Sequence, residues 1–435
     1  MSTTRVLALD ALVRIEDGAY ANLLLPELLR RRDLEARDRA FVTDLVYSTV
    51  RQQRALDFVL ARFSSRPLHK LDAPVRAALR LGAFQLGAGM AAHAAVGETV
   101  EAAPERARGF VNGTLRSLAR AGPPWPLPEG DDAASIGIRT SHPDWIVETF
   151  IRELGTEAAL ATLELDNQPP PVTLRVNGTR TTPPRAIAQL EGLGVEVEQS
   201  TVVPDSLLVR HTGDLAAVPL VRDGALVVQE QASTAVVAAL DPQPGEHVLD
   251  VAAAPGGKSI TAAGRMTQDG LVVAADVHAA RVRMMARTFE RVGARRAVPV
   301  VADGRHLPFG DQRFDRVLVD APCSGLGVLR RRPDARWRVQ PHDVDDLAAL
   351  QRELLVEAAR VVRPGGRLVY SVCTITAAET EGVDAFAADE LPDLVACEPP
   401  WPTGGAWRAR GRGTLLVPSA AGTDGMFVLV LERSR

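Results

Sequence analysis

From residue 226 onward, short apolar strands alternate with helices, and this alternation constrains the fold more than any other feature of the chain. Strands are predicted in the sequences HVLD, GLVVAADV, AVPVVADG, FDRVLVDAP and RLVYSVC, with a sixth in GMFVLVLERS. Helical segments such as AARVRMMARTFERVG lie between them. This order predicts a doubly wound parallel sheet of the Rossmann-like type. Ligands of such sheets bind beyond the carboxyl ends of the strands.

Two other regions precede this alternation, so the 435 residues are expected to form three domains. Residues 1–125 carry apolar residues at helical spacing, for example Val6, Leu9 and Val13, and predict an all-α domain. Residues 121–135 are dense in Pro, Gly and Asp and predict a linker. Residues 136–225 mix helices with short strands, which is typical of a small α+β module with a ferredoxin-like fold. Residues 226–435 form the α/β domain.

Composition limits the classes of protein that need to be considered. The net charge of −4 means that any polyanion site must be a local patch. Apart from Lys70 and Lys258 the basic residues are arginines, so arginine richness is weak evidence for RNA. No apolar run could cross a membrane, and the N-terminus lacks the pattern of a signal peptide. Three separated cysteines, with His93, His142 and His278 lacking metal-ligand spacing, predict a reducing cytoplasm and no metal.

The sequence DVAAAPGGKS, residues 250–259, places a loop of small residues directly after a strand. A dinucleotide fingerprint would need G-x-G-x-x-G, which is absent. A phosphate loop matches at its end, in GKS, but would need glycine in place of Ala252. Pro255 also removes a backbone N–H that a phosphate cradle would use. The remaining interpretation is the first loop of an S-adenosylmethionine (SAM) methyltransferase, in which small residues let the backbone approach the cofactor.

Three aspartates end the strands that follow this loop. Asp276 is placed to accept the hydroxyls of a ribose, and Asp303 lies within reach of an adenine amino group. Asp320 ends the next strand. A single aspartate at a strand end is more often a cap or turn residue than a ligand. Three of them on successive strands after a glycine loop favour a cofactor that carries a nucleoside.

Two of the 3 cysteines fall at the same predicted edge of the sheet. Cys323 follows one strand in DAPCSG, and Cys373 closes the next in YSVCT. Free cysteines are usually buried and inert, and we assign that role to Cys397. A thiolate beside a SAM methyl group suggests pyrimidine C5 chemistry. Addition of the thiolate at C6 makes C5 nucleophilic, C5 takes the methyl group, and loss of the C5 proton expels the thiol.

The motifs DVAAAPGGKS, DAPCSGLGVLRRRPDARW and YSVCT resemble those of RNA cytosine-C5 methyltransferases of the Sun family. The helical N-terminus is similar to the NusB-type RNA-binding domain. The resemblance spans essentially the whole chain, and the stretch from DAPCSG to RRRPD is its specific part. It implies an all-α NusB-like domain, a ferredoxin- or RRM-like middle module and a Rossmann-like methyltransferase domain. It also implies SAM as cofactor and 16S ribosomal RNA as partner, within an assembling subunit or free, and we expect a monomer without a membrane contact.

Carried over by position, the resemblance implies that Cys373 is the nucleophile, that Cys323 helps to release the product and that Asp320 contacts N3 of the base. The implied SAM-binding residues are Ala252, Ala253, Ala254, Pro255, Gly256, Gly257, Lys258, Asp276, Asp303 and Asp320. The family loop often opens with Cys where this chain has Ala252, and its TCS triplet is VCT here. The backbone makes the first contact, and Thr374 can supply a hydroxyl similar to that of the serine.

The arginine-rich stretch RRRPDARWR, residues 330–338, follows the Cys323 loop. It is either a solvated basic loop or a phosphate clamp at the mouth of the site, with Trp337 available for stacking. Its position favours the clamp, because the target base must leave its stack to reach the thiol.

Three alternatives to the cytosine-C5 methyltransferase remain open. Cys323 could be the nucleophile of an enzyme that acts on another RNA, such as tRNA. The chain could be a non-catalytic NusB-type antitermination factor, although Lys258, the aspartates and both thiols argue against this. A nucleotide hydrolase built on GGKS is disfavoured by Ala252 and Pro255.

Overall fold

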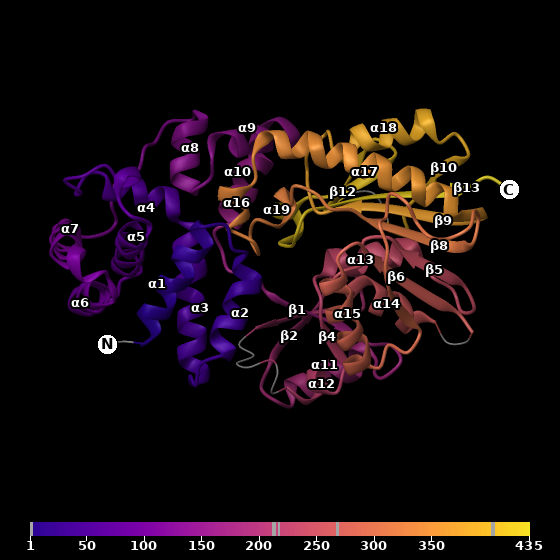
Figure 1. Ribbon diagram of the computed structural model, residues 1–435, viewed down its shortest axis with the longest axis horizontal. Helices are drawn as coiled ribbons and strands as arrows, with labels where there is room; N and C mark the ends of the chain where they lie inside the picture. The colour runs from indigo at the N-terminus through magenta and orange to yellow at the C-terminus, as the bar shows by residue number, and fades with distance from the viewer. Residues whose placement is uncertain (1–2, 211–214, 216–217, 267–268, 402–404) are drawn as a thin grey trace. The chain divides into compact units, whose positions relative to one another are not determined.

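The computed structural model describes residues 3–210, 215, 218–266, 269–401 and 405–435 (Figure 1). The described chain forms two compact units. One consists of Met1–Pro169 with Leu329–Val339, and the other of Pro170–Val328 with Gln340–Arg435. None of the described helices is both long and apolar enough to cross a membrane.

The first unit, called the helical unit below, is all-α, as the N-terminal sequence predicts. Its helices are α1 (Thr3–Glu16), α2 (Ala21–Arg30), α3 (Ala36–Arg51), α4 (Gln53–Leu60), α5 (Ala73–Gly87), α6 (Ala92–Ala102), α7 (Arg108–Ala121), α8 (Ala133–Thr140), α9 (Asp144–Leu154), α10 (Thr156–Leu165) and α16 (Ala335–Arg338), with 3-10 turns at Leu68–Lys70 and Glu105–Ala107. Helix α5 begins with Pro74 in its first turn, where a missing N–H costs nothing. Its buried residues, among them Leu79 and Leu81, anchor the core.

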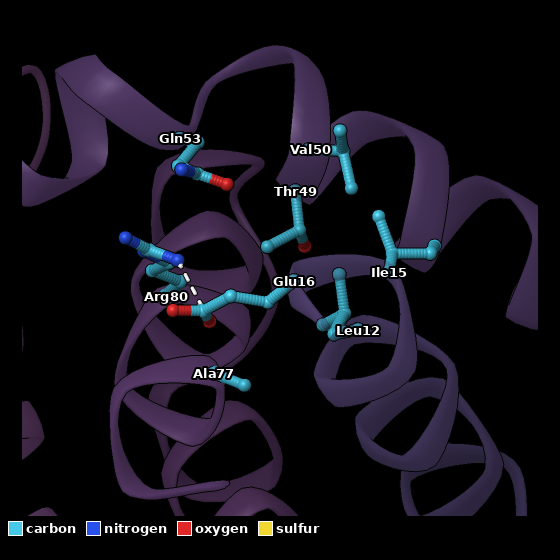
Figure 2. Close-up of a pocket in the computed structure, with 8 residues that line it drawn as sticks. All are labelled: Leu12, Ile15, Glu16, Thr49, Val50, Gln53, Ala77 and Arg80. Atoms are coloured by element: carbon cyan, nitrogen blue, oxygen red, sulfur yellow. Dashed lines mark hydrogen bonds and ion pairs between the residues drawn. The ribbon is translucent and has the colours of Figure 1, made fainter. Parts of the chain in front are cut away.

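A small pocket lies between helices α1, α3 and α5 of the helical unit (Figure 2). Its lining residues are Leu12, Ile15, Glu16, Thr49, Val50, Gln53, Ala77 and Arg80. The Arg80 guanidinium donates to both carboxylate oxygens of Asp57 at 2.7 Å and to Glu16 at 3.2 Å. These ion pairs neutralise the buried Arg80 side chain. We therefore interpret the pocket as a packing gap between the helices and assign it no ligand.

Residues 172–228 form a four-stranded antiparallel sheet with the order β2-β3-β1-β4. The elements are β1 (Val172–Val176), α11 (Pro183–Glu191), β2 (Glu196–Gln199), β3 (Ser206–Arg210), α12 (Pro219–Arg222) and β4 (Leu226–Val228). This order is that of a ferredoxin-like module, which confirms the predicted fold class. Strand β4 lies beyond residue 225, and helices α8–α10, which the sequence analysis groups with this module, belong to the helical unit.

The remaining elements build a larger sheet with helices on both faces. They are α13 (Gln231–Leu240), β5 (His247–Asp250), α14 (Gly257–Arg265), β6 (Leu271–Asp276), α15 (Ala279–Val292), β7 (Ala297–Val301), β8 (Phe314–Asp320), a 3-10 turn (Leu326–Val328), α17 (Pro341–Val361), β9 (Val362–Val372), α18 (Glu381–Glu390), β10 (Leu394–Cys397), β11 (Trp407–Arg410), β12 (Gly413–Leu416), α19 (Pro418–Ala421) and β13 (Met426–Arg433). Helices α13–α15 cover one face and α17 and α18 the other (Figure 1).

The strand order is β11-β12-β13-β9-β8-β5-β6-β7, and β10 also pairs with β13. Strands β7, β6, β5, β8 and β9 are parallel, as predicted. The expectation of a wholly parallel sheet is wrong at β13, which runs antiparallel to β9. Strand β13 is also antiparallel to its other neighbour β12, because the four-residue helix α19 between them is too short for the crossover that parallel neighbours need. The five parallel strands therefore define one carboxyl edge.

Candidate active site at the carboxyl edge of the sheet

The residues singled out at strand ends do meet at this edge. Asp276 and Asp320 are the last residues of β6 and β8. Asp303 follows the end of β7 after one intervening residue, and Cys373 directly follows β9. The register pairs Asp320 with Ser371 and Asp276 with Val301, so these ends lie level across neighbouring strands.

The loop between β5 and α14 turns sharply over this edge. It contains a cis peptide bond between Ala254 and Pro255. Gly256 has a φ of +97°, and a Cβ atom there would lie 2.6 Å from the Phe289 ring. Only glycine tolerates both the positive φ and the close approach to Phe289. The turn of the loop therefore carries no side chain at position 256. Helix α14 then starts at Gly257 and directs its first turn toward the strand ends.

Asp250, at the end of β5, is a candidate that the sequence analysis did not select. Its side chain is buried, Oδ2 accepts a 2.6 Å hydrogen bond from the Ser259 hydroxyl, and Oδ1 has no protein partner. Burial raises the pKa of Asp250 to about 7. A buried carboxyl with an unused oxygen at the base of the loop is typical of a ligand-binding edge. The signal was available in the sequence, since Asp250 opens the DVAAAPGGKS motif.

Asp276 and Asp303 present carboxylates that differ in burial and in hydrogen-bond partners. The Asp276 Oδ1 atom accepts a hydrogen bond from the His278 N–H at 2.8 Å, which orients the buried side chain. Asp303 is more exposed and pairs with Arg305 at 2.7 Å. The Arg305 hydrogen bonds lower the pKa of Asp303 to about 2. Both groups are acceptors suited to the hydroxyl and amino groups of a nucleoside. With the small-residue loop beside them, the donor and acceptor set fits a nucleoside-bearing cofactor.

Lys258 and Asp320 form the charged centre of the edge. The Lys258 ammonium lies 2.7 Å from Asp320 Oδ2 and 3.3 Å from the Ser233 hydroxyl. Burial alone would lower the pKa of Lys258, but the charge of Asp320 and the hydrogen bond to it outweigh burial and raise this pKa. The Ser371 hydroxyl donates to the other Asp320 oxygen at 2.8 Å. The carboxylate is therefore held from both sides, and Lys258 stays protonated.

The two cysteines expected at this edge are in contact. The Sγ atoms of Cys323 and Cys373 are 3.2 Å apart, and both residues are partly exposed. The hydrogen bond with Cys373, followed by burial, raises the pKa of Cys323 well above its ordinary value. The raised pKa disfavours a thiolate on Cys323, and either thiol can donate in the contact between them. Cys397 lies instead on β10, away from the parallel strand ends.

A buried polar network joins the two cysteine loops and was not found from the sequence. Glu379, which is fully buried, accepts hydrogen bonds from the Ser324 N–H and hydroxyl, from Gln351 and from Thr376. Ser324 and Thr374, the residues that follow the two cysteines, hydrogen-bond to each other at 2.7 Å. The hydroxyl expected at Thr374 is thus used within the protein. Most of these side chains are uncharged, and they come from separate segments of the chain. The spacing of residues in the sequence therefore does not indicate the network.

The interpretation of the arginine-rich stretch as a phosphate clamp is wrong for Arg330, Arg336 and Trp337. Arg336 is completely buried in the helical unit, and Arg330 is buried and donates to the carbonyls of Gln168 and Pro169. The Trp337 indole donates to the Val50 carbonyl at 3.1 Å. These groups satisfy helix carbonyls of the helical unit, so they cannot face RNA phosphates at the same time.

One of the histidines to which the sequence analysis assigns no role, His142, lies inside the helical unit. His142 is buried, and its Nε2 atom lies 3.5 Å from Asp166 Oδ2. Burial, followed by the charge of Arg336, lowers the pKa of His142 well below its ordinary value, so the ring is neutral.

Three family models match successive parts of the chain, in an order that agrees with the fold. The model described as "16S rRNA methyltransferase RsmB/F" matches residues 237–432, the "NusB family" matches residues 2–120, and the "Methyltr_RsmF/B-like, ferredoxin-like domain" matches residues 142–216. The first covers every strand end described above.

Full-length relatives and a solved structure agree with these matches. The protein named "Probable ribosomal RNA small subunit methyltransferase B" of Bacillus subtilis (strain 168) is 34% identical over 99% of both chains. The ribosomal RNA small subunit methyltransferase B of Vibrio cholerae serotype O1 is 32% identical over 99% of this chain and 97% of its own. The crystal structure of PH0851 superposes with a TM-score of 0.84 at 27% identity, covering 100% of this chain and 99% of that one.

These similarities run through the helical unit, the ferredoxin-like module and the sheet whose edge carries the loop, the carboxylates and the paired thiols. The matched methyltransferase family and a methyltransferase homologue of known structure, which is 26% identical and covers 70% of this chain with a TM-score of 0.62, indicate SAM as the cofactor. The chain therefore belongs to the RsmB/F family of 16S rRNA methyltransferases and is a SAM-dependent RNA methyltransferase.

Proposed function

We propose that the enzyme methylates C5 of a cytidine in 16S ribosomal RNA through a covalent adduct between Cys373 and C6 of the base. The observation that carries this proposal is the contact between two thiols, 3.2 Å apart, beside a partly buried lysine–aspartate pair. Methylation of a nitrogen or a ribose hydroxyl needs no cysteine nucleophile. A thiol is needed where the carbon to be methylated must first be activated.

Cys373 is the better nucleophile of the two cysteines. The hydrogen bond with Cys373 and burial raise the pKa of Cys323 and disfavour a thiolate there, which leaves Cys373 as the thiol of the pair to ionise. The charge on Cys373 is also among the causes that raise the pKa of Lys258, so a thiolate there and the ammonium stabilise each other. The resemblance to the Sun family implies the same assignment. Here it also has support from the chemistry of the site.

The reaction then follows from these groups. The Cys373 thiolate adds to C6, which places a negative charge on the base that a protonated N3 would neutralise. Asp320, held by Lys258 and Ser371, lies at the strand end beside Cys373 and is proposed to contact N3. SAM, when bound, supplies the electrophilic methyl group that C5 accepts. The C5 proton passes to solvent water, the C5–C6 double bond reforms and the C6–S bond breaks, which expels the Cys373 thiolate, to which Cys323 can donate its proton.

The proposed cofactor contacts are the loop Ala252–Lys258 with Asp276, Asp303 and Asp320. The loop brings backbone close to the cofactor because Ala252, Ala253 and Ala254 are small and Gly256 has positive φ. Asp276 is the proposed partner of the ribose hydroxyls, and Asp303 that of the adenine. Asp303 must leave Arg305 to make this contact.

The setting of the reaction is also proposed. We propose residues 1–125 as a NusB-like RNA-binding domain, residues 136–225 as a second RNA-binding module and residues 226–435 as the catalytic domain. The relatives named above are small-subunit methyltransferases, which supports 16S rRNA as the substrate, free or in an assembling subunit. The enzyme is proposed to act as a monomer in the cytoplasm.

Bisulfite sequencing of ribosomal RNA from a strain that lacks the gene tests reaction and target together. One 5-methylcytosine in 16S rRNA is expected to disappear and to return with the wild-type gene, but not with a Cys373→Ala gene. An unchanged 16S pattern, with a site lost in tRNA instead, would assign the enzyme to another RNA.

A further inference from the structure

Glu379 sits between the two cysteine loops without touching either sulfur. It is fully buried on the segment that links β9 to α18. Oε1 accepts hydrogen bonds from the Ser324 N–H at 2.8 Å and from Gln351 Nε2 at 3.0 Å. Oε2 accepts from the Ser324 hydroxyl at 2.5 Å and from Thr376 at 2.8 Å. A single carboxylate thus binds the residue after Cys323 and the loop that follows Cys373.

The two cysteines differ in what else holds them. Cys373 extends strand β9, whose last residues pair with β8 on one side and β13 on the other. Its carbonyl oxygen also accepts a hydrogen bond from the Gly327 N–H at 3.0 Å. Cys323 lies in a loop without strand pairing after Ala321. The Ser324 backbone and hydroxyl contacts with Glu379 hold the residue directly after Cys323.

A second layer supports the same carboxylate. Gln351 on α17 donates to the Pro322 carbonyl at 2.8 Å as well as to Glu379. The Tyr370 hydroxyl lies 2.9 Å from Gln351 Oε1 and 2.7 Å from the Glu379 carbonyl oxygen. Because every group in this network is buried, each bond has a preferred geometry and the loop cannot drift without leaving a polar group unpaired.

We infer that Glu379 is a positioning residue that holds Cys323 against Cys373 and thereby sets the rate at which the covalent RNA adduct is resolved. The inference rests on the proposed function, in which Cys373 forms the adduct and Cys323 assists its release. Glu379 acts through Ser324 and has no contact with the reacting atoms. Loss of its carboxylate displaces Cys323 and leaves Cys373, which the strands hold, in place.

The test compares adduct formation with adduct resolution. Glu379→Ala should bind SAM and form the adduct with cytidine RNA at close to the wild-type rate. Resolution should slow by about 100-fold, as is typical for a misplacement of about 1 Å. The protein–RNA adduct should then accumulate with ordinary RNA and appear as a denaturant-stable band, as it should for Cys323→Ala.

Glu379→Gln is the matched rescue variant. Its amide oxygen can still accept from the Ser324 N–H and from Gln351, while its NH2 group donates to the hydroxyls of Ser324 and Thr376, which accept as well as donate. Resolution should return to within about threefold of wild type, because geometry is kept and only the charge is lost. If Glu379→Gln accumulates adduct like Glu379→Ala, the charge matters and the positioning role is refuted.

Two further variants separate positioning from general instability. Tyr370→Phe removes a buried hydroxyl from the same network and keeps every bond to Ser324, so it should resolve the adduct normally. Ser324→Ala keeps the N–H bond and loses the hydroxyl bond, so it should slow resolution to an intermediate extent, even if Glu379→Ala fails to fold. Equal loss of formation and resolution in Glu379→Ala, without accumulation, would refute the inference. A wild-type enzyme that forms no adduct with 5-fluorocytidine RNA would instead refute the proposed function.

Discussion

Arg336 lies at the centre of the helical unit, and its replacement by Met should destabilise that unit by about 3–5 kcal/mol. The guanidinium donates to the carbonyls of Arg51 at 3.0 Å, Asp166 at 2.6 Å and Ser141 at 3.3 Å, and to Asn167 Oδ1 at 2.8 Å. Four lost bonds at about 1 kcal/mol each give a similar magnitude. Burial lowers the pKa of Arg336 only to about 10, so the lost group is a charged donor at neutral pH.

Native-state hydrogen exchange measures this effect locally. Amides in α3, α8 and α10, whose C-terminal ends supply the carbonyl acceptors of Arg336, should lose protection in Arg336→Met by the free energy given above. Arg332→Met is the matched control, since Arg332 is exposed in the same stretch, and it should change protection by no more than about 0.5 kcal/mol.

The same variant distinguishes a structural arginine from an RNA contact. A phosphate contact would reduce the slope of log affinity against log salt by about 0.7–0.9 when removed. Arg336→Met should leave this slope unchanged under conditions where the protein is folded. Unaltered exchange together with a reduced salt slope would refute the structural role and restore the phosphate clamp.

The remaining predictions concern the candidate site. Cys373→Ala should abolish the covalent adduct with 5-fluorocytidine RNA on denaturing gels while Cys323→Ala retains it, and the opposite result would make Cys323 the nucleophile. Lys258→Met should lower the methylation rate by about 100-fold because Asp320 loses its ion pair, as followed by methyl transfer from labelled SAM. Burial raises the pKa of Asp250 from 3.8 to about 7, so the folded state retains an extra proton between these values. The contribution of Asp250 to the free energy of unfolding is complete at low pH and is lost as pH rises through about 7. Asp250→Asn should remove this part of the pH dependence of the melting temperature.

Much of the catalytic half could be predicted because its information is local. Each of the candidate aspartates and Cys373 lies at the end of a strand or within two residues of it, and parallel strands bring their carboxyl ends to one edge. Asp276, Asp320 and Cys373 could be placed together on this basis, before any contact was known. The antiparallel β13 could not be placed in the same way, because strand direction depends on the connection and on the neighbours and not on the strand's own residues.

Burial of polar groups was the least predictable property. RRRPDARWR has the composition of a solvated basic loop, yet Arg336 is completely buried. A run of arginines has the same sequence whether its guanidinium groups meet water, phosphate or the carbonyl oxygens at helix ends. The carbonyls of Arg51, Ser141 and Asp166 come from three distant segments, so only folding of the chain reveals that they converge on one guanidinium.

The sequence by itself determined the classes of the three folds, the candidate edge of the sheet and the candidate residues at that edge, because periodicity, glycine loops and strand ends are written in consecutive positions. Only the tertiary structure decided that the two thiols touch and that Glu379 links their loops. These are contacts across 50 or 55 residues of chain, as the pairs Cys323–Cys373 and Ser324–Glu379 show. Their energies depend on distance and burial, which exist only once the chain has folded.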